Sequence, residues 1–259
     1  MERGDTAGRA PARPGRPDDL PSFFAQPAGQ DLFQIGTATA SRGDLAEAAR
    51  LYRLAANQGN ASAQVNLGIY YERGLGGLKK DEREAARLYR LAANQGNARA
   101  QSVLANLYRD GRGGLHKDYN EAARLLRLAA NQGDAAAQSD LGVMYAEGAG
   151  GLPQDDREAA RLYRLAADQG ESWGELNLGY TYSLGLGGLP KDEREALRLY
   201  RLAANQGNPI AQSNLANGYW EGRDGLPKDQ QEAIRLWQQS ARGGNARAQE
   251  NLRAVGQTW

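Results

Sequence analysis

Several residue types that carry chemistry are scarce or missing in this sequence. It contains no cysteine, which excludes disulfide bonds, thiolate metal sites and a thiol nucleophile. Its one histidine is His116, so no second histidine can complete a metal site or an acid–base pair. We therefore expect no metal, no cofactor and no catalytic centre, and we interpret His116 as a surface-loop residue.

Net charge and long apolar runs are missing as well. The 32 lysines and arginines are matched by 31 aspartates and glutamates, so no overall field draws the chain to nucleic acid or to an anionic membrane. No stretch reaches the roughly 18 to 20 apolar residues that a membrane span needs. The first residues also lack the apolar core of a secretory signal. We expect a soluble, cytoplasmic protein without membrane insertion.

Glycine is abundant instead, with 33 residues, and an internal repeat accounts for it. The segment EAARLYRLAANQG begins at Glu47 and recurs every 37 residues with small changes, at Glu84, Glu121, Glu158, Glu195 and Glu232. Five complete units follow from this period, numbered one to five: residues 60–96, 97–133, 134–170, 171–207 and 208–244. Residues 23–59 form a shortened, degenerate unit, and residues 245–259 form a half unit that caps the array. Residues 1–22 have hardly any apolar side chains, so we expect a disordered tail.

The signals at helix ends predict two helices in each unit. The second helix follows an Asp with a Glu three residues later, as in Asp81 and Glu84. This spacing predicts a capping box, in which the Glu side chain also reaches back to the N–H of the cap. The helix ends at NQG, where Gly96 can adopt a left-handed conformation, and Asn97 then caps the next helix. Helices of about 12 to 15 residues are unstable alone and depend on stacking against their neighbours.

The repeated pattern resembles a known family. It reads AxAQxxLGxxY, a glycine-rich turn, then DxxEAxxLYxxAAxQGN, and unit one shows it as ASAQVNLGIYYERGLGGLKKDEREAARLYRLAANQGN. This is similar to the Sel1-like repeat, a relative of the tetratricopeptide repeat, over residues 60–253 closely and 31–59 loosely. The resemblance implies an all-α fold, a right-handed α-solenoid of stacked antiparallel helix pairs. It also implies a concave groove, lined mainly by the first helix of each pair, that serves as a scaffold or adaptor for protein partners.

The five units can be compared with one another to locate the free face of that groove. In the first helix, counted from residue 61 in unit one, positions 3, 4, 7, 8 and 11 are nearly constant and share one face. Positions 2, 5, 9, 12 and 13 vary and fall on the opposite face, where unit four places large apolar side chains that are typical of binding hot spots. The predicted partner-binding residues are Trp173, Leu176, Tyr180, Leu184, Ile210, Asn217, Trp220, Arg99, Asn106 and Arg109.

Unit four leaves a structural alternative open. Gly174 and Glu175 stand there in place of the alanine and glutamine of the other units. Trp173 could therefore turn inward and fill the core, in which case its truncation would cost about 3 to 5 kcal/mol.

Two further motifs look chemical. The loop GLGGLPKD and its variants resemble a phosphate-binding loop, but they lack the GK[ST] ending and follow no strand, so we expect their glycines to serve the backbone. An arginine pair recurs in the second helices, as in Arg87 and Arg90, and could form a basic ridge for nucleic acid. Each first arginine, however, lies three residues after a capping glutamate, which predicts an ion pair. We do not expect nucleic-acid binding.

These observations favour a non-enzymatic protein-interaction scaffold whose concave face, centred on units four and five, binds a segment of another protein. A regulatory or sensory module for a small molecule or glycan is the alternative. A hydrolase comes third, because some cysteine-rich secreted members of the resembled family are linked to penicillin binding and β-lactamase activity. The missing cysteines count against it.

Overall fold

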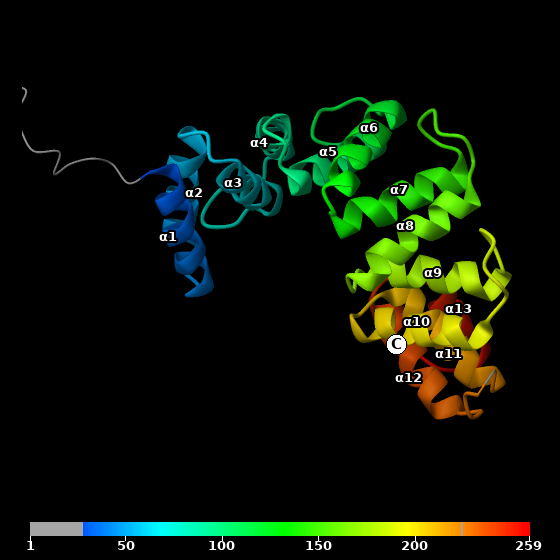
Figure 1. Cartoon of the computed structure of the whole chain (residues 1–259). Coiled ribbons are helices and arrows are strands. Elements are labelled where there is room, and N and C mark those ends of the chain that lie inside the picture. The colour runs from blue at the N-terminus through cyan, green and yellow to red at the C-terminus, as the bar shows by residue number, and fades with distance from the viewer. Residues whose placement is uncertain (1–27, 224) are drawn as a thin grey trace, which may run out of the picture.

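The chain folds as a right-handed α-solenoid (Figure 1). The computed structural model describes residues 28–223 and 225–259, and all regular structure in these ranges is helical. The helices are α1 (Gly29–Ser41), α2 (Leu45–Asn57), α3 (Ala61–Arg73), α4 (Glu82–Asn94), α5 (Ala98–Asp110), α6 (Tyr119–Asn131), α7 (Ala135–Glu147), α8 (Asp156–Asp168), α9 (Ser172–Leu184), α10 (Glu193–Asn205), α11 (Pro209–Glu221), α12 (Gln230–Arg242) and α13 (Ala246–Ala254). None of them is long and apolar enough to cross a membrane. The tail predicted for residues 1–22 lies outside the described ranges.

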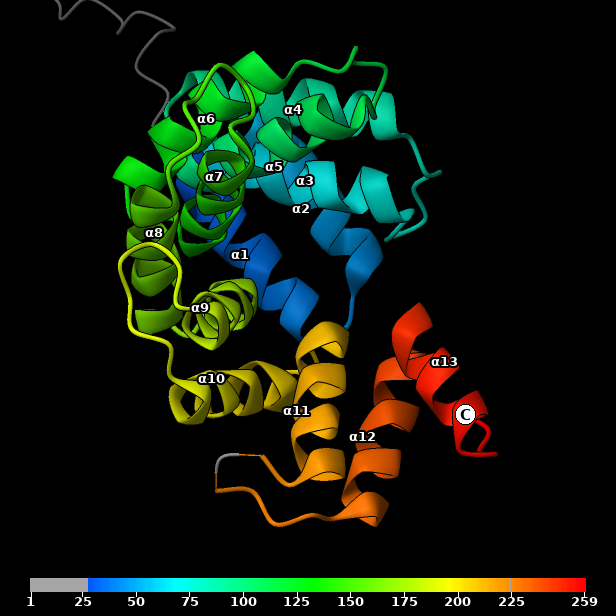
Figure 2. The same cartoon turned by 90° about the vertical axis from the view of Figure 1, so that its right-hand side faces the viewer.

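Consecutive helices form antiparallel pairs that stack along a curved path. The view in Figure 2 shows α5, α7 and α9 nearer the middle of the curve than α4, α6, α8 and α10. The first helix of each unit therefore lines the concave face, as the resemblance to the Sel1-like repeat implied.

The helix starts are capped by the predicted residues. Asp81 Oδ1 accepts the N–H of Glu84 at 3.0 Å, and Gly96 has a φ of 85°, as the NQG motif predicted. The second half of the predicted capping box is wrong, because the N–H of Asp81 donates to the carbonyl of Tyr71 at 2.9 Å. The Glu84 carboxylate is thus free to pair with Arg87 at 2.7 Å. Units two to five repeat this arrangement at their own aspartate, glutamate and arginine.

The small residue at position 8 of the first helix packs against an aromatic ring of the second. A Cβ built on Gly68 would lie 2.6 Å from Cε1 of Tyr89, and one on Gly142 would lie 2.6 Å from Cε1 of Tyr163, so these positions need glycine. In unit two the ring is replaced by Leu126, and the facing residue is alanine. In units one to four the two side chains compensate in size within one unit, whereas in unit five Ala216 stands with Trp237.

A buried glutamine at position 4 links three helices. Gln64 is 4% exposed, and its Nε2 donates to the carbonyl of Ala56 at the end of α2 at 3.3 Å. Its Oε1 accepts from Nε2 of Gln95, which follows α4, at 2.8 Å. Units two and three repeat both bonds. Gln95, Gln132 and Gln169 therefore each complete a hydrogen-bond chain between neighbouring helix pairs.

Unit four changes this link, because Glu175 stands in the position of the glutamine. The carboxylate is 4% exposed and accepts from Nε2 of Gln206 at 2.8 Å, as a glutamine oxygen would. An ionised carboxylate cannot donate a hydrogen bond, so the bond to a carbonyl of the preceding helix pair is missing in unit four. Burial raises the pKa of Glu175, while the bond from Gln206 opposes this rise.

The loops within the units depend on left-handed glycines. Gly76 has a φ of 59°, and a Cβ on it would lie 2.3 Å from the carbonyl oxygen of Leu45 in the preceding pair. Gly187 in unit four has the same conformation and a Cβ there would lie 2.3 Å from the carbonyl oxygen of Asp156. The predicted backbone role of the loop glycines is confirmed at these positions, since a side chain would prevent the loop from seating on its neighbour.

Candidate binding surface

Four of the six apolar side chains predicted on the concave side of units four and five are exposed. Trp173 is 49% exposed, Tyr180 54%, Leu184 51% and Ile210 40%. Trp173 therefore does not fill the core, which rejects the structural alternative. The space left by the missing alanine is closed by the side chain of Ala166 in α8, since a Cβ on Gly174 would lie 2.5 Å from the Cβ of Ala166.

Leu176 corrects the sequence prediction, because it is only 4% exposed. It packs in a buried cluster with Leu197, Ala211 and Leu215. The rest of its column is buried as well, namely Val65, Ser102, Ser139 and Ser213. Position 5 varies in sequence but faces the next helix pair, a contact that a single-helix wheel does not include. Leu176 is thus a core residue.

Trp220 and Asn217 form a half-buried wall at the C-terminal end of this surface. The ring of Trp220 packs against that of Trp237, with centroids 5.2 Å apart. The Nε1 of Trp237 donates to Oδ1 of Asn217 at 3.1 Å, and Nδ2 of Asn251 donates to the same oxygen at 3.2 Å. Both predicted residues therefore support the surface as well as line it.

Two of the three predicted polar residues of unit two converge on Asp140, a residue that the sequence prediction missed. Its carboxylate accepts from Nδ2 of Asn106 at 2.9 Å and pairs with Nη1 of Arg109 at 3.3 Å. These side chains, with Val143 and Trp173, line a cavity of about 490 Å³. Arg99 is exposed and does not line it. Sequence position alone gives no signal for Asp140, because position 6 was assigned to neither face.

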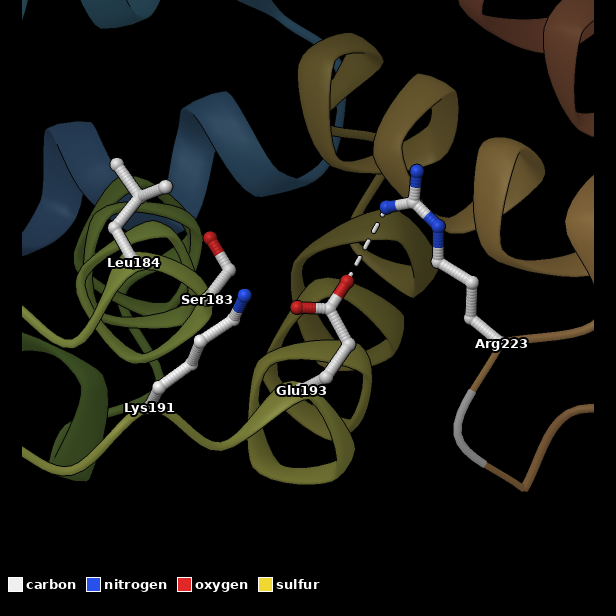
Figure 3. Close-up of a pocket in the computed structure, with 5 residues that line it drawn as sticks. All are labelled: Ser183, Leu184, Lys191, Glu193 and Arg223. Carbon is white, nitrogen blue, oxygen red and sulfur yellow. Dashed lines mark hydrogen bonds and ion pairs between the residues drawn. The ribbon is translucent and has the colours of Figure 1, made fainter.

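A second hollow lies between α9, α10 and α11. One cavity of about 450 Å³ is lined by Tyr180, Tyr200, Ile210 and Arg247, among others. An adjoining cavity of about 510 Å³ shares Ser183, Leu184, Glu193 and Arg223 with it and adds Lys191 (Figure 3). Apolar walls and charged side chains therefore meet at the same point of the concave surface.

The remaining candidate motifs form no site in the described residues. The first arginines of the pairs bind the capping glutamates of their own helices, as in Arg161 with Glu158 at 2.7 Å, which confirms the predicted ion pairs. His116 is exposed in its loop. Within residues 28–223 and 225–259, no group of three His, Cys, Asp or Glu residues could hold a metal ion.

Known repeat proteins share both the sequence pattern and this architecture. The Sel1 repeat model matches residues 29–60, 61–97, 98–134, 135–171, 174–208 and 209–245. The crystal structure of a Sel1 repeat protein from Oxalobacter formigenes is 32% identical, with a TM-score of 0.73, and the alignment covers 87% of this chain and 88% of that one.

Two further solved structures are similar. The protective antigen c5321 of uropathogenic Escherichia coli, which displays an SLR fold, is 32% identical with a TM-score of 0.55, over 88% of this chain and 56% of that one. The immunity protein PA5088 from Pseudomonas aeruginosa is 22% identical with a TM-score of 0.54, over 87% and 85%, and this shows the fold alone. No curated protein sequence matches the chain at a significant level. The six matched repeats and the O. formigenes structure show that this chain belongs to the Sel1 repeat family.

Proposed function

We propose that the concave face of units three to five binds a segment of a partner protein. Sel1 repeat proteins generally mediate protein–protein interactions. The observation that carries the proposal is the exposure of Trp173, Tyr180, Leu184 and Ile210 on a face that the packing of the solenoid leaves free. Exposed aromatic and aliphatic side chains grouped in this way are typical of binding hot spots.

The shape of the surface favours a polypeptide over a small molecule or glycan. The cavities of about 490 and 450 Å³ are half-open hollows that follow one another along neighbouring units. Small-molecule sites are instead concave enough to bury about 70 to 90% of the ligand surface. A chain segment that runs across several units can contact both cavities.

A photo-crosslinking amino acid at Tyr180 would identify the partner in the native cell. The purified partner is then titrated by calorimetry against the wild-type chain and the Trp173→Ala, Tyr180→Ala double variant. We expect the double variant to bind at least about tenfold more weakly, or about 1.4 kcal/mol, because two hot-spot side chains are removed. Tyr119→Ala is the matched control, since Tyr119 is 43% exposed at the start of α6. Equal affinity of the double variant and the control would refute the proposal.

Thermal denaturation separates a binding defect from a folding defect. Trp173 is half exposed, so we expect its truncation to change stability by less than about 1 kcal/mol. Trp237, by contrast, is 3% exposed, and Trp237→Ala should cost about 3 to 5 kcal/mol. A loss at Trp173 as large as that at Trp237 would mean that Trp173 supports the fold.

A further inference from the structure

Two junctions of the solenoid, separated by three units, have almost the same side chains. At the first, the carboxylate of Glu72 lies between two partners: it accepts from the hydroxyl of Tyr89 at 2.9 Å and pairs with Nη2 of Arg112 at 3.4 Å. Arg112 also pairs with Glu82 at 3.1 Å. The space between Glu72, Glu82 and Tyr89 is too small for a water molecule. The carboxylate fills this junction.

The second junction keeps the partners and loses the carboxylate. Residues 111 positions later are Tyr200, Glu193 and Arg223, and Arg223 Nη1 again pairs with Glu193, at 3.2 Å. Ser183 stands in the place of Glu72. A cavity of about 510 Å³ opens there, with Ser183 at its edge (Figure 3). The chain itself thus shows which chemical group fits the opened position.

The two adjoining cavities bring together three cations, Arg223, Lys191 and Arg247, and Arg223 pairs with two carboxylates, Glu193 and Glu221. Lys80 pairs with Glu82 at the first junction, whereas no ion pair of Lys191 is present in the described residues. Arg247 lines the adjoining cavity. Glu221 binds Nε of Arg223 and Glu193 binds its Nη1, which leaves Nη2 without a bond in the described residues. The hydroxyl of Tyr200 is hydrogen-bonded to Ser183, the residue that replaces Glu72.

Unit three shows that the loss of the carboxylate alone does not produce this arrangement. Ala146 stands there at the position of Glu72, and Leu186 stands at the position of the arginine. The junction of units four and five combines an absent carboxylate with a retained arginine, lysine and tyrosine. It also adjoins Tyr180 and Ile210, which are apolar and exposed.

We propose that an aspartate or glutamate side chain of the partner segment occupies this junction, with its carboxylate bound by Arg223 and Lys191, which both line the cavity. The neighbouring apolar side chain of the segment then lies against Tyr180 and Ile210. Charge-assisted hydrogen bonds from an arginine fork give such a site both strength and orientation. The inference rests on the proposed function and narrows it to a partner segment that places an acidic residue beside an apolar one.

The chain offers its own substitution for the test. Ser183→Glu restores the carboxylate found at Glu72, so it should fold normally and occupy the site from within. Arg223→Gln removes the main cation without closing the cavity. Arg112→Gln is the matched control, because it breaks the equivalent pair at the first junction, away from the proposed surface.

The probe is a synthetic library of 12-residue peptides with amidated C-termini, screened on the wild-type chain. We expect the bound peptides to carry an Asp or Glu within three residues of an aromatic or aliphatic residue. Ser183→Glu and Arg223→Gln should each lower the affinity for these peptides at least tenfold, and Arg112→Gln should leave it unchanged. Replacing the acidic residue of a peptide by its amide should weaken binding to wild type tenfold and leave binding to Ser183→Glu unchanged.

The outcomes separate the two proposals. The screen could return peptides that require Trp173 and Tyr180 for binding and yet bind Ser183→Glu with the same affinity as the wild-type chain. Such peptides would overturn the carboxylate site and leave the proposed function standing. Dependence on a free C-terminal carboxylate, tested with the non-amidated library, would also overturn the side-chain assignment. An absence of any peptide that depends on Trp173 and Tyr180 would overturn both.

Discussion

Replacing Glu175 by glutamine should stabilise the solenoid. Glu175 is 4% exposed and stands where the other units have a glutamine that donates to a carbonyl eight residues earlier. The amide would restore that donor, toward the carbonyl of Ala167, and keep the acceptor for Gln206. A hydrogen bond of this kind contributes about 1 kcal/mol. In a chain of this size that corresponds to an increase in Tm of about 2 to 4 °C.

The stabilisation should depend on pH, because burial raises the pKa of Glu175 above the ordinary value of 4.5. Of the charged groups around the carboxylate, Glu171 on its own segment raises this pKa and Arg198 on α10 lowers it. The folded state therefore holds the proton more tightly than the unfolded state. The cost of burying the charge is absent below pH 4.5, grows as pH rises through the raised pKa, and is fully present above it.

Circular dichroism melts at pH 5 and pH 8 would measure this effect. We expect Glu175→Gln to raise Tm more at pH 8 than at pH 5. Gln138→Glu is the matched reverse change in unit three and should lower Tm, again more at pH 8. An equal shift at both pH values, or a lower Tm for Glu175→Gln at pH 8, would refute the link between burial and ionisation.

Two further predictions test the packing and the surface charges. Gly142→Ala should cost about 1 to 3 kcal/mol in urea denaturation, because its Cβ would meet the ring of Tyr163 at 2.6 Å. In a Tyr163→Leu background the same change should be neutral or stabilising, since alanine favours a helix over glycine by about 1 kcal/mol; a full cost there would contradict the steric explanation. Arg161→Gln should change the free energy of unfolding by less than about 0.5 kcal/mol, because its pair with Glu158 is exposed. A loss above about 1 kcal/mol would show that the pair stabilises the fold more than an exposed ion pair should.

The repeat allowed the fold to be predicted in detail. The NQG and Asp signals placed both ends of the second helices because capping is local and depends on a few neighbouring residues. The Glu84 side chain was assigned wrongly because its supposed donor, the N–H of Asp81, is taken by Tyr71, ten residues away. Such competition for a donor depends on the path of the loop, which the sequence pattern does not specify.

The candidate surface was predictable only for side chains whose exposure depends on their position around a single helix. Trp173 and Tyr180 lie on its free side, and a helical wheel placed them there. Leu176 was misplaced because each first helix contacts two neighbours, its own second helix and the next pair. Ser183 was not among the predicted binding residues, because a single serine on a helix gives no signal of a binding site. A comparison with Glu72 was available in the sequence, but the partners of Glu72 become visible only in three dimensions.

The size match between position 8 and the facing ring has a consequence for how such arrays change over generations. Gly68 and Tyr89 belong to one unit, and so do Gly142 and Tyr163. A gene segment that encodes one whole unit therefore carries both members of the pair. Duplication or exchange of such segments in frame would lengthen or recombine the inner surface while each core pair stays matched. A breakpoint between the two positions would separate them, and joining the first helix of unit two to the second helix of unit one would set Ala105 against the ring of Tyr89.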